Sequence, residues 1–269
     1  MMQLSFFQAL KIHWPEYLVE AWGLGTFMVS ACFFAVFFYH PRSVVGLGND
    51  YVLNALMGLM MGLTAVAVIL SPLGKRSGAH INPAVTLTFF RLGKIRFWDA
   101  LFYVLFQFIG GTAGVFLSWI LLGNWLEDSA VNFVVTVPGK EGLGVAFFAE
   151  FVISFLLMGM ILVTTNSTRL MKYTAWLAGI LIMLFIAFEA RYSGMSMNPA
   201  RSFASALVAN YWTALWIYFV SPVVAMFFAA EIFTKLKGAE GVKCAKLHHH
   251  NKQRCIFCGK PSGSHNPEE

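Results

Sequence analysis

Long apolar runs separated by short polar connections dominate this chain. Crossing the hydrocarbon core of a bilayer, about 30 Å thick, takes roughly 20 apolar residues of helix. Five runs reach that length, at residues 17–39, 51–71, 98–122, 143–165 and 212–234. A sixth run at 174–190 is shorter, but the 15 residues from Thr174 to Phe188 carry no charge. The pattern predicts six membrane-spanning helices and therefore an all-α membrane protein in a lipid bilayer.

The first apolar run is predicted to be a retained span rather than a signal peptide. It is 23 residues long and follows Lys11, His13 and Glu16. A signal peptide would instead have a short apolar region that ends at a small-residue cleavage site.

The basic residues lie mainly on one side of the six expected spans. If the N-terminus is cytoplasmic, 15 of the 19 Lys and Arg residues lie inside, and Arg42, Lys140, Arg191 and Arg201 lie outside. Cytoplasmic loops of membrane proteins are enriched in Lys and Arg. We therefore expect both termini in the cytoplasm and a location in the cell membrane, either a plasma membrane or a bacterial inner membrane. Without a span at 174–190 this asymmetry would disappear.

The amino-acid composition argues against several classes of protein. Hydrophobic residues make up 58% of the 269 residues and charged residues only 12%, about half the usual share. A soluble enzyme, a disulfide scaffold and a nucleic-acid-binding protein all fit poorly. The formal net charge of +6 does not require a nucleic acid, because two thirds of it belongs to the last 35 residues, which would face the anionic cytoplasmic leaflet.

Two short apolar segments repeat one motif. The segments are SGAHINPAVTLTFFRLG at 77–93 and SGMSMNPARSFASALVAN at 193–210, and both contain Asn-Pro-Ala. Each half of the chain, about 15–122 and 142–234, has three full spans, so the second half begins on the opposite face of the membrane. The repeat is therefore inverted. Short segments interrupted by Gly and Pro at matching positions of inverted repeats indicate a transport site near the midplane.

Asn-Pro-Ala is expected to start a half-helix in each repeat. Asn is a favoured N-cap, and Pro is favoured at the first helical position. If the Asn82 and Asn198 side-chain oxygens accept first-turn N–H groups, their amide NH2 groups remain as donors that face a common point. The positive ends of the two helix dipoles meet there and disfavour a cation.

With these motifs the chain resembles the aquaporin, or major intrinsic protein, family over about residues 15–235. The resemblance rests on SGAHINPAVT (77–86), NPARSF (198–203), YVLFQFIGGTAG (103–114), WIYFVSP (216–222), Glu20 and Glu150. It implies a right-handed bundle of six spans and two half-helices at 1–237, a homotetramer with one pore per subunit, and no required cofactor. The implied pore residues are Asn82, Pro83, Ala84, Asn198, Pro199 and Ala200, with Glu20, Glu150, Gln107 and His80 as supports.

The resemblance also implies a selectivity filter that contains Arg201. Its other members are Ile186, Met195 and either Met61 or Gly62, because two ways of aligning the second span differ by one residue. Ile186 stands where strict water channels usually have His. The filter is therefore more apolar than in strict water channels, and wider if Gly62 faces the pore.

Other positions favour water over glycerol. Ser202 stands where glycerol facilitators have Asp, and Tyr218-Phe219 is an aromatic pair typical of water channels. We expect a passive channel for water that also passes small neutral solutes such as ammonia, hydrogen peroxide or urea. The alternatives are a channel mainly for such a solute or for glycerol, and a secondary transporter, which also uses inverted repeats and broken helices. A structural protein with a vestigial pore fits less well, and no catalytic constellation indicates an enzyme.

The tail at 238–269 lies outside the resemblance. Its run CAKLHHHNKQRCIFCGK offers Cys244, Cys255 and Cys258 together with His248, His249 and His250. Thiolate and imidazole are the ligands that zinc prefers, and a cytosolic position favours a metal over a disulfide. The set proposed for zinc is Cys255, Cys258, Cys244 and His250. The alternative is a flexible, unliganded tail.

Overall fold

The computed structural model describes residues 4–44, 49–249 and 251–263, and these form helices and loops. Six helices are long and apolar enough to span a membrane, as the sequence predicts. Five of them are α1 (Phe6–Tyr39), α2 (Asp50–Leu70), α5 (Phe97–Leu122), α7 (Leu143–Thr165) and α11 (Leu215–Lys237), and the sixth comprises η2 (Met171–Tyr173) and α8 (Thr174–Phe188).

The first span begins earlier than the hydropathy pattern suggests. α1 starts at Phe6 because Ser5 and Gln8 form a capping box, and Pro15 lies inside the helix. The polar residues that precede the apolar run are therefore helical. His13 and Glu16 are buried against other elements, where Asp99 accepts from the His13 ring at 2.7 Å.

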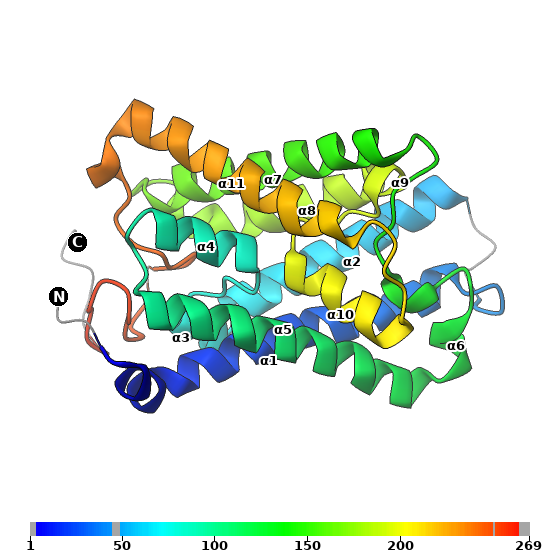
Figure 1. Cartoon of the computed structure of the whole chain (residues 1–269), viewed down its shortest axis with the longest axis horizontal. Coiled ribbons are helices and arrows are strands. Elements are labelled where there is room, and N and C mark those ends of the chain that lie inside the picture. Colours follow the sequence, from blue (N-terminus) through cyan, green and yellow to red (C-terminus); the bar gives the residue numbers. More distant parts are fainter. Residues whose placement is uncertain (1–3, 45–48, 250, 264–269) are drawn as a thin grey trace.

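Two half-helices lie inside the bundle. They are α4 (Pro83–Arg91) and α10 (Pro199–Ala209), and each begins directly after an asparagine N-cap. Figure 1 shows them end to end along the long axis, with their N-termini meeting in the middle. At nine and eleven residues, they are too short to cross a bilayer. This is the inverted arrangement that the repeat predicts.

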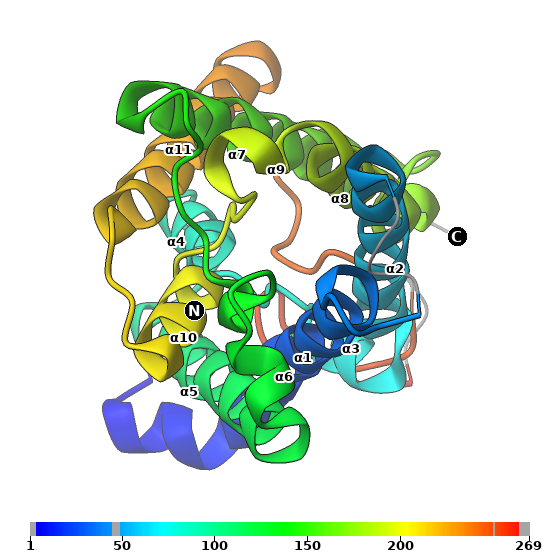
Figure 2. The ribbon, with the colours of Figure 1, turned by 90° about the vertical axis from the view of Figure 1, so that its right-hand side faces the viewer.

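The three major helix pairs are α1 with α5, α2 with α8, and α7 with α11. Glycines allow the close approach within one chain. A Cβ at Gly110 would lie 2.0 Å from the Ala21 carbonyl oxygen, and one at Gly62 would lie 2.4 Å from that of Gly179. Viewed along the long axis, the helices surround a central region (Figure 2).

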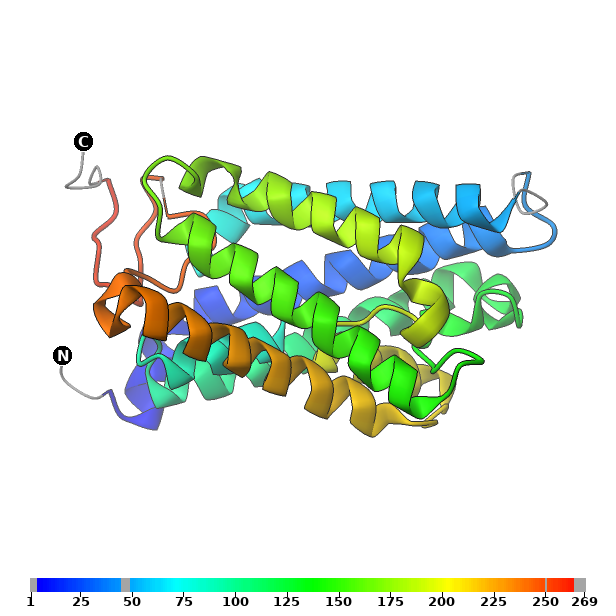
Figure 3. The ribbon, with the colours of Figure 1, turned by 90° about the horizontal axis from the view of Figure 1, so that it is seen from above.

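The remaining short elements connect these helices at the two ends of the bundle. They are α3 (Pro72–Ser77), α6 (Asn124–Glu127), η1 (Asn132–Val134), α9 (Ala190–Ser193) and η3 (Ala239–Gly241). The start of α1 and residues 251–263 lie at the same end of the bundle, which we call the tail end, and Figure 3 shows this end on the left. Residues 251–263 fold back over it. The outer surface of the spans carries exposed large apolar side chains, as a lipid-facing surface requires, among them Ile109, Ile120, Phe148 and Phe228.

Candidate pore and its supports

The loops that lead into the two half-helices share an unusual backbone. The residues three and one before each asparagine have positive φ, with values of 53° at Ala79, 42° at Ile81, 49° at Met195 and 55° at Met197. Non-glycine residues in such conformations cost about 1–3 kcal/mol each and persist only where their surroundings hold them. The strain occurs at matching positions in both halves, so the two loops are built alike.

Glu20 of α1 holds the first loop. Its carboxylate accepts hydrogen bonds from the backbone N–H groups of His80 at 3.1 Å and Ile81 at 2.6 Å. It also accepts from Ser77 Oγ at 2.7 Å and from Gln107 Nε2 at 2.8 Å. Glu20 is fully buried, and these four donors satisfy a carboxylate that would otherwise be costly at this depth.

Glu150 of α7 plays the same part in the second loop. It accepts from the backbone N–H groups of Ser196 at 2.7 Å and Met197 at 2.8 Å, and from Ser193 Oγ at 2.8 Å. Tyr218 is also buried, and its hydroxyl donates to the Ser193 carbonyl at 2.6 Å. Tyr218 therefore braces the loop from α11.

The two asparagines tie the loops to each other. Asn82 Oδ1 accepts from the Ala84 N–H at 2.8 Å, and Asn198 Oδ1 accepts from that of Ala200 at 3.1 Å. Asn82 Nδ2 then donates to the Met197 carbonyl at 2.7 Å, and Asn198 Nδ2 donates to that of Ile81 at 2.8 Å. From the sequence alone, both N–H bonds of each amide group are expected to remain as donors. The structure shows that one of its two N–H bonds goes to the opposite loop, so one remains for a ligand.

A cavity of about 260 Å³ runs past both asparagines, with room for several water molecules. Both halves of the chain line it. Its residues include His80, Asn82, Ile186, Met195, Asn198 and Arg201. Among the described lining residues, Arg201 alone has a side chain with a permanent charge.

Arg201 is held at the end of the cavity away from the tail. Its Nη1 donates to the carbonyl of Val134 at 2.8 Å. Val134 and its neighbours Asn132 and Phe133 all have positive φ, between 42° and 53°. A strained turn therefore presents this carbonyl to the guanidinium, and the remaining N–H groups of Arg201 stay available on the cavity side.

The two alternatives at the second span, Met61 and Gly62, differ in their position relative to the cavity. Met61 lines the cavity together with Ile186 and Met195. Gly62 is not among the lining residues; it lies against Gly179 in the contact between α2 and α8. Helix packing requires a glycine there, and we therefore propose Met61 rather than Gly62 as the filter residue.

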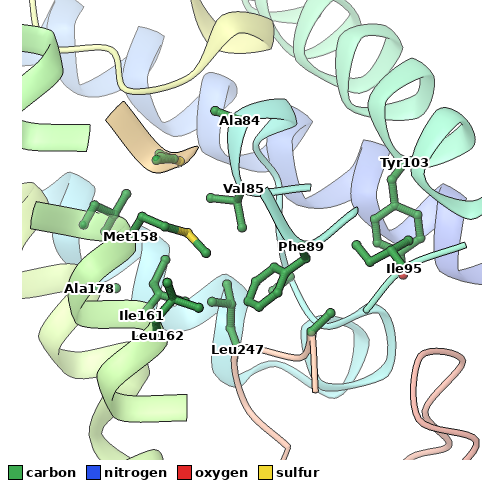
Figure 4. Close-up of a cluster of buried hydrophobic side chains, with 14 of the residues drawn as sticks. Ala84, Val85, Phe89, Ile95, Tyr103, Met158, Ile161, Leu162, Ala178 and Leu247 are labelled. Carbon is green, nitrogen blue, oxygen red and sulfur yellow. The ribbon is translucent and has the colours of Figure 1, made fainter. Parts of the chain in front are cut away.

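The tail is packed where it is described, rather than extended into solvent. Leu247 reaches the cavity, and Figure 4 shows it between Phe89 of α4 and Ile161 and Leu162 of α7. His80 Nε2 lies 2.7 Å from the Ala245 carbonyl oxygen. Sequence reasoning missed these contacts, since tail and loop are more than 160 residues apart.

Three cysteines and one histidine of the tail come together. The ligand atoms of Cys244, His249, Cys255 and Cys258 all lie within 4.8 Å of one another. His250, the fourth ligand expected from the sequence, lies outside the described residues. Its neighbour His249 stands at the cluster instead.

These features define a membrane protein with six spans and two half-helices that meet at a central cavity. Residues 15–233 match the family described as Major intrinsic protein. The chain belongs to this family. Membership supports the expectation that it is a channel and not an enzyme, and that it needs no cofactor to act.

Curated relatives and a solved structure agree with this assignment. The chain is 34% identical over 187 residues to Aquaporin NIP1-2 of Arabidopsis thaliana, covering 67% of this chain and 62% of the relative. It is 35% identical over 175 residues to Aquaporin-5 of Mus musculus, covering 63% and 64%. The matched stretch thus spans somewhat less than two thirds of these relatives. The X-ray structure of the aquaglyceroporin from Plasmodium falciparum shares the fold, with a TM-score of 0.67, 20% identity, and coverage of 84% of this chain and 96% of that one.

Proposed function

We propose that this protein is a passive channel for water that also passes small neutral solutes. The observation that carries the proposal is the cavity into which Asn82 and Asn198 project from two opposed half-helices. One N–H of each amide remains to hold a water oxygen. The meeting helix N-termini and Arg201 disfavour protons and other cations.

The cavity favours a channel over a coupled transporter. A secondary transporter needs an ion site or an ionisable relay near its substrate. Glu20 and Glu150 are not among the cavity-lining residues, and loop N–H groups occupy their oxygens. We infer that both carboxylates support the loops and carry no proton through the membrane.

The filter is proposed to consist of Arg201, Ile186, Met195 and Met61. Three of these side chains are apolar, and Ile186 stands where strict water channels usually have His, so the filter lacks a hydrogen-bonding group and a constriction that would select water. This observation favours ammonia, hydrogen peroxide and urea as additional solutes. Glycerol is less favoured, because Ser202 stands where glycerol facilitators have Asp.

We further propose a homotetramer with one pore per subunit, a position in the cell membrane, and cytoplasmic termini. In this arrangement residues 1–237 are the channel and 238–269 a cytoplasmic tail. The tail end of the bundle is then the cytoplasmic end.

Proteoliposomes with the full-length protein test the function. Osmotic shock in a stopped-flow instrument should reveal water flux well above that of empty liposomes, driven by the osmotic gradient alone. Ile186→His should keep most of the water flux and reduce urea and hydrogen peroxide flux several-fold, because it narrows the filter and adds a hydrogen-bonding group. Arg201→Val should admit cations that the wild-type protein excludes.

Phe148→Leu, a change on the lipid-facing surface, serves as the matched control and should alter neither flux. Water flux no greater than the lipid background, with and without a metal chelator present, would contradict the proposed function.

A further inference from the structure

The four tail residues at the tail end have the geometry of a metal site. The Sγ atoms of Cys244 and Cys255 are 3.5 Å apart, and His249 Nε2 lies 3.2 Å from Cys258 Sγ. A tetrahedral zinc ion with Zn–S bonds of about 2.3 Å and Zn–N bonds of about 2.0 Å places its ligand atoms roughly 3.5–3.8 Å apart. The two shortest separations are near this value and all four atoms lie within 4.8 Å of one another, so small side-chain movements would bring them to a common ion.

Local backbone structure brings two of these thiols together. The Gly259 N–H donates to the Cys255 carbonyl at 3.0 Å, and the Cys255 N–H donates to the Lys260 carbonyl at 2.8 Å. Gly259 has φ of 78°, which its lack of a side chain permits. This tight turn holds Cys255 and Cys258 on one side of the cluster.

The donor set selects the class of metal. Three thiols and an imidazole suit zinc and other thiophilic ions, whereas magnesium and calcium require oxygen ligands. The cysteines are free thiols in the structure, and their 3.5 Å separation is far longer than a disulfide bond of about 2.05 Å.

Two of the ligands, Cys244 and His249, flank the segment of the tail that contacts the end of the cavity at Leu247. We call residues 244–247 the covering segment. Cys244 directly precedes Ala245, whose carbonyl oxygen lies against His80 Nε2, and His249 follows two residues after Leu247. The Leu247 N–H donates to the Gly78 carbonyl at 3.2 Å, and its side chain lines the cavity and packs beside Phe89 (Figure 4). A metal bound by both flanking ligands would fix this segment as a short closed loop.

Aromatic contacts fasten the cluster to the same loop. Phe257, between two of the cysteines, stacks on the His80 ring at 5.5 Å with an interplanar angle of 5°. Phe257 also makes an edge contact with Tyr103 at 5.7 Å. His80, which lines the cavity, therefore contacts the tail twice: its ring stacks on Phe257, and its Nε2 lies against the Ala245 carbonyl oxygen.

Ion pairs anchor the tail to the first span. Arg254, next to Cys255, donates to both carboxylate oxygens of Glu16, at 2.8 and 2.6 Å. Glu16 is fully buried and also accepts from Arg76 at 3.0 Å. Lys246, inside the covering segment, donates to the Arg254 carbonyl at 2.6 Å. The metal cluster, the anchor and the covering segment are therefore one connected unit.

We propose that Cys244, His249, Cys255 and Cys258 bind one zinc ion, and that this ion holds residues 244–247 over the cytoplasmic mouth of the pore and so lowers its permeability. The metal site stands on the cluster alone, whereas its effect on flux rests on the proposed channel function. Loss of the metal would release the two ends of the covering segment and open the mouth.

The binding half of the proposal is tested on the full-length protein in detergent under reducing conditions. Titration with Co²⁺ as a probe should give the visible bands of tetrahedral, thiolate-bound cobalt, saturate at one ion per chain, and be displaced by Zn²⁺. Cys255→Ser/Cys258→Ser should lose this spectrum. Cys32→Ala, which changes the one cysteine inside the membrane-spanning region, should keep it.

The gating half is tested by water flux from proteoliposomes equilibrated with zinc or with a chelator on both sides of the membrane. Chelation should raise the wild-type flux several-fold, and Cys255→Ser/Cys258→Ser should be high in both conditions. Leu247→Gly should conduct well even with zinc while it retains the cobalt spectrum, which separates covering from metal binding. Cys32→Ala should respond as the wild type does.

Three results would overturn the inference. If the wild-type protein does not give the spectrum of tetrahedral cobalt, the four residues do not form the proposed metal site. Equal wild-type flux with zinc and with chelator removes the gating role. If no sample conducts water at all, the proposed function fails, and the covering role is then overturned if zinc does not slow tryptic cleavage after Lys252 in the wild type relative to the double variant.

Discussion

Buried carboxylates organise this protein at the residue scale. Glu20 and Glu150 could be recognised in the sequence as acidic residues within apolar runs, which need donors. The donors are backbone N–H groups of the loops that precede the two Asn-Pro-Ala motifs. Glu189 could not be recognised in the same way, because it lies at the end of a span where charge is common.

The pKa of Glu189 yields a prediction about pH. Ser193 Oγ lies 2.5 Å from Glu189 Oε1 and 2.8 Å from Glu150 Oε1, but it has only one proton to donate. Burial and then the nearby Glu150 charge raise the pKa of Glu189 to about 8 from 4.5. Between these values the unfolded carboxyl is ionised and the folded one is not. Stability therefore falls as pH rises through this window, by at most about 1.4 kcal/mol per pH unit.

Glu189→Gln should remove this dependence. Its thermal unfolding temperature in detergent should change less between pH 5 and pH 9 than that of the wild type. The variant Glu231→Gln, on the exposed surface of α11, provides the control and should keep the wild-type slope. If the unfolding temperature of the wild type and that of Glu189→Gln changed equally with pH, Glu189 would not be protonated in the folded protein.

At the scale of elements, the inverted repeat determines how helices pair. The pairs α1 with α5 and α7 with α11 occupy equivalent places in the two halves, and α2 with α8 joins the halves. Small residues spaced four apart in the sequence indicate that two helices approach closely, but they do not show which helix is the partner or which face of the helix makes the contact. That is why Met61 and Gly62 could not be separated by sequence alone. One residue of register rotates a helix by about 100°, and only the packed partner fixes that rotation.

The contact between α1 and α5 should be sensitive to a single methyl group. A Cβ at Gly110 would lie 2.0 Å from the Ala21 carbonyl oxygen, so Gly110→Ala must push the two helices apart. Overpacking of this kind costs about 1–3 kcal/mol, and here the neighbour is backbone that cannot turn aside. We expect a lower unfolding temperature and a lower yield of monodisperse protein in detergent.

Gly159→Ala on α7 is the matched control for this prediction. A Cβ there meets nothing within 4 Å, and alanine favours a helix over glycine by about 1 kcal/mol. This variant should be as stable as the wild type or more so. Equal stability of Gly110→Ala and Gly159→Ala would contradict the packing argument.

At the scale of the whole molecule, the excess of Lys and Arg on one side of the membrane predicts that both termini are cytoplasmic. This orientation can be measured by labelling an exposed cysteine. Of the four cysteines, Cys258 is exposed and the other three are buried. A membrane-impermeant maleimide should therefore label the protein in cells only after permeabilisation in the presence of a metal chelator, which frees Cys258 from any bound zinc. Arg42→Cys, on the exposed loop at the other end, should be labelled in intact cells. Labelling of the wild type in intact cells would reverse the proposed orientation.

The sequence by itself determined the six spans, the inverted repeat and the two half-helices. It could do so because span length, capping and charge bias are local properties that depend on residues close together in the chain. It also placed the asparagines and Arg201, since a motif at a helix N-terminus sets its own geometry.

Only the tertiary structure decided which residues far apart in the chain meet. Met61 lies at the cavity and Gly62 in a helix contact, one N–H of each asparagine amide donates to the opposite loop, and the tail packs against His80. Contacts of this kind depend on how whole helices are rotated and packed, and no local pattern records that rotation. The tail shows this most clearly, because its cysteines were visible in the sequence while the pore mouth they border was not.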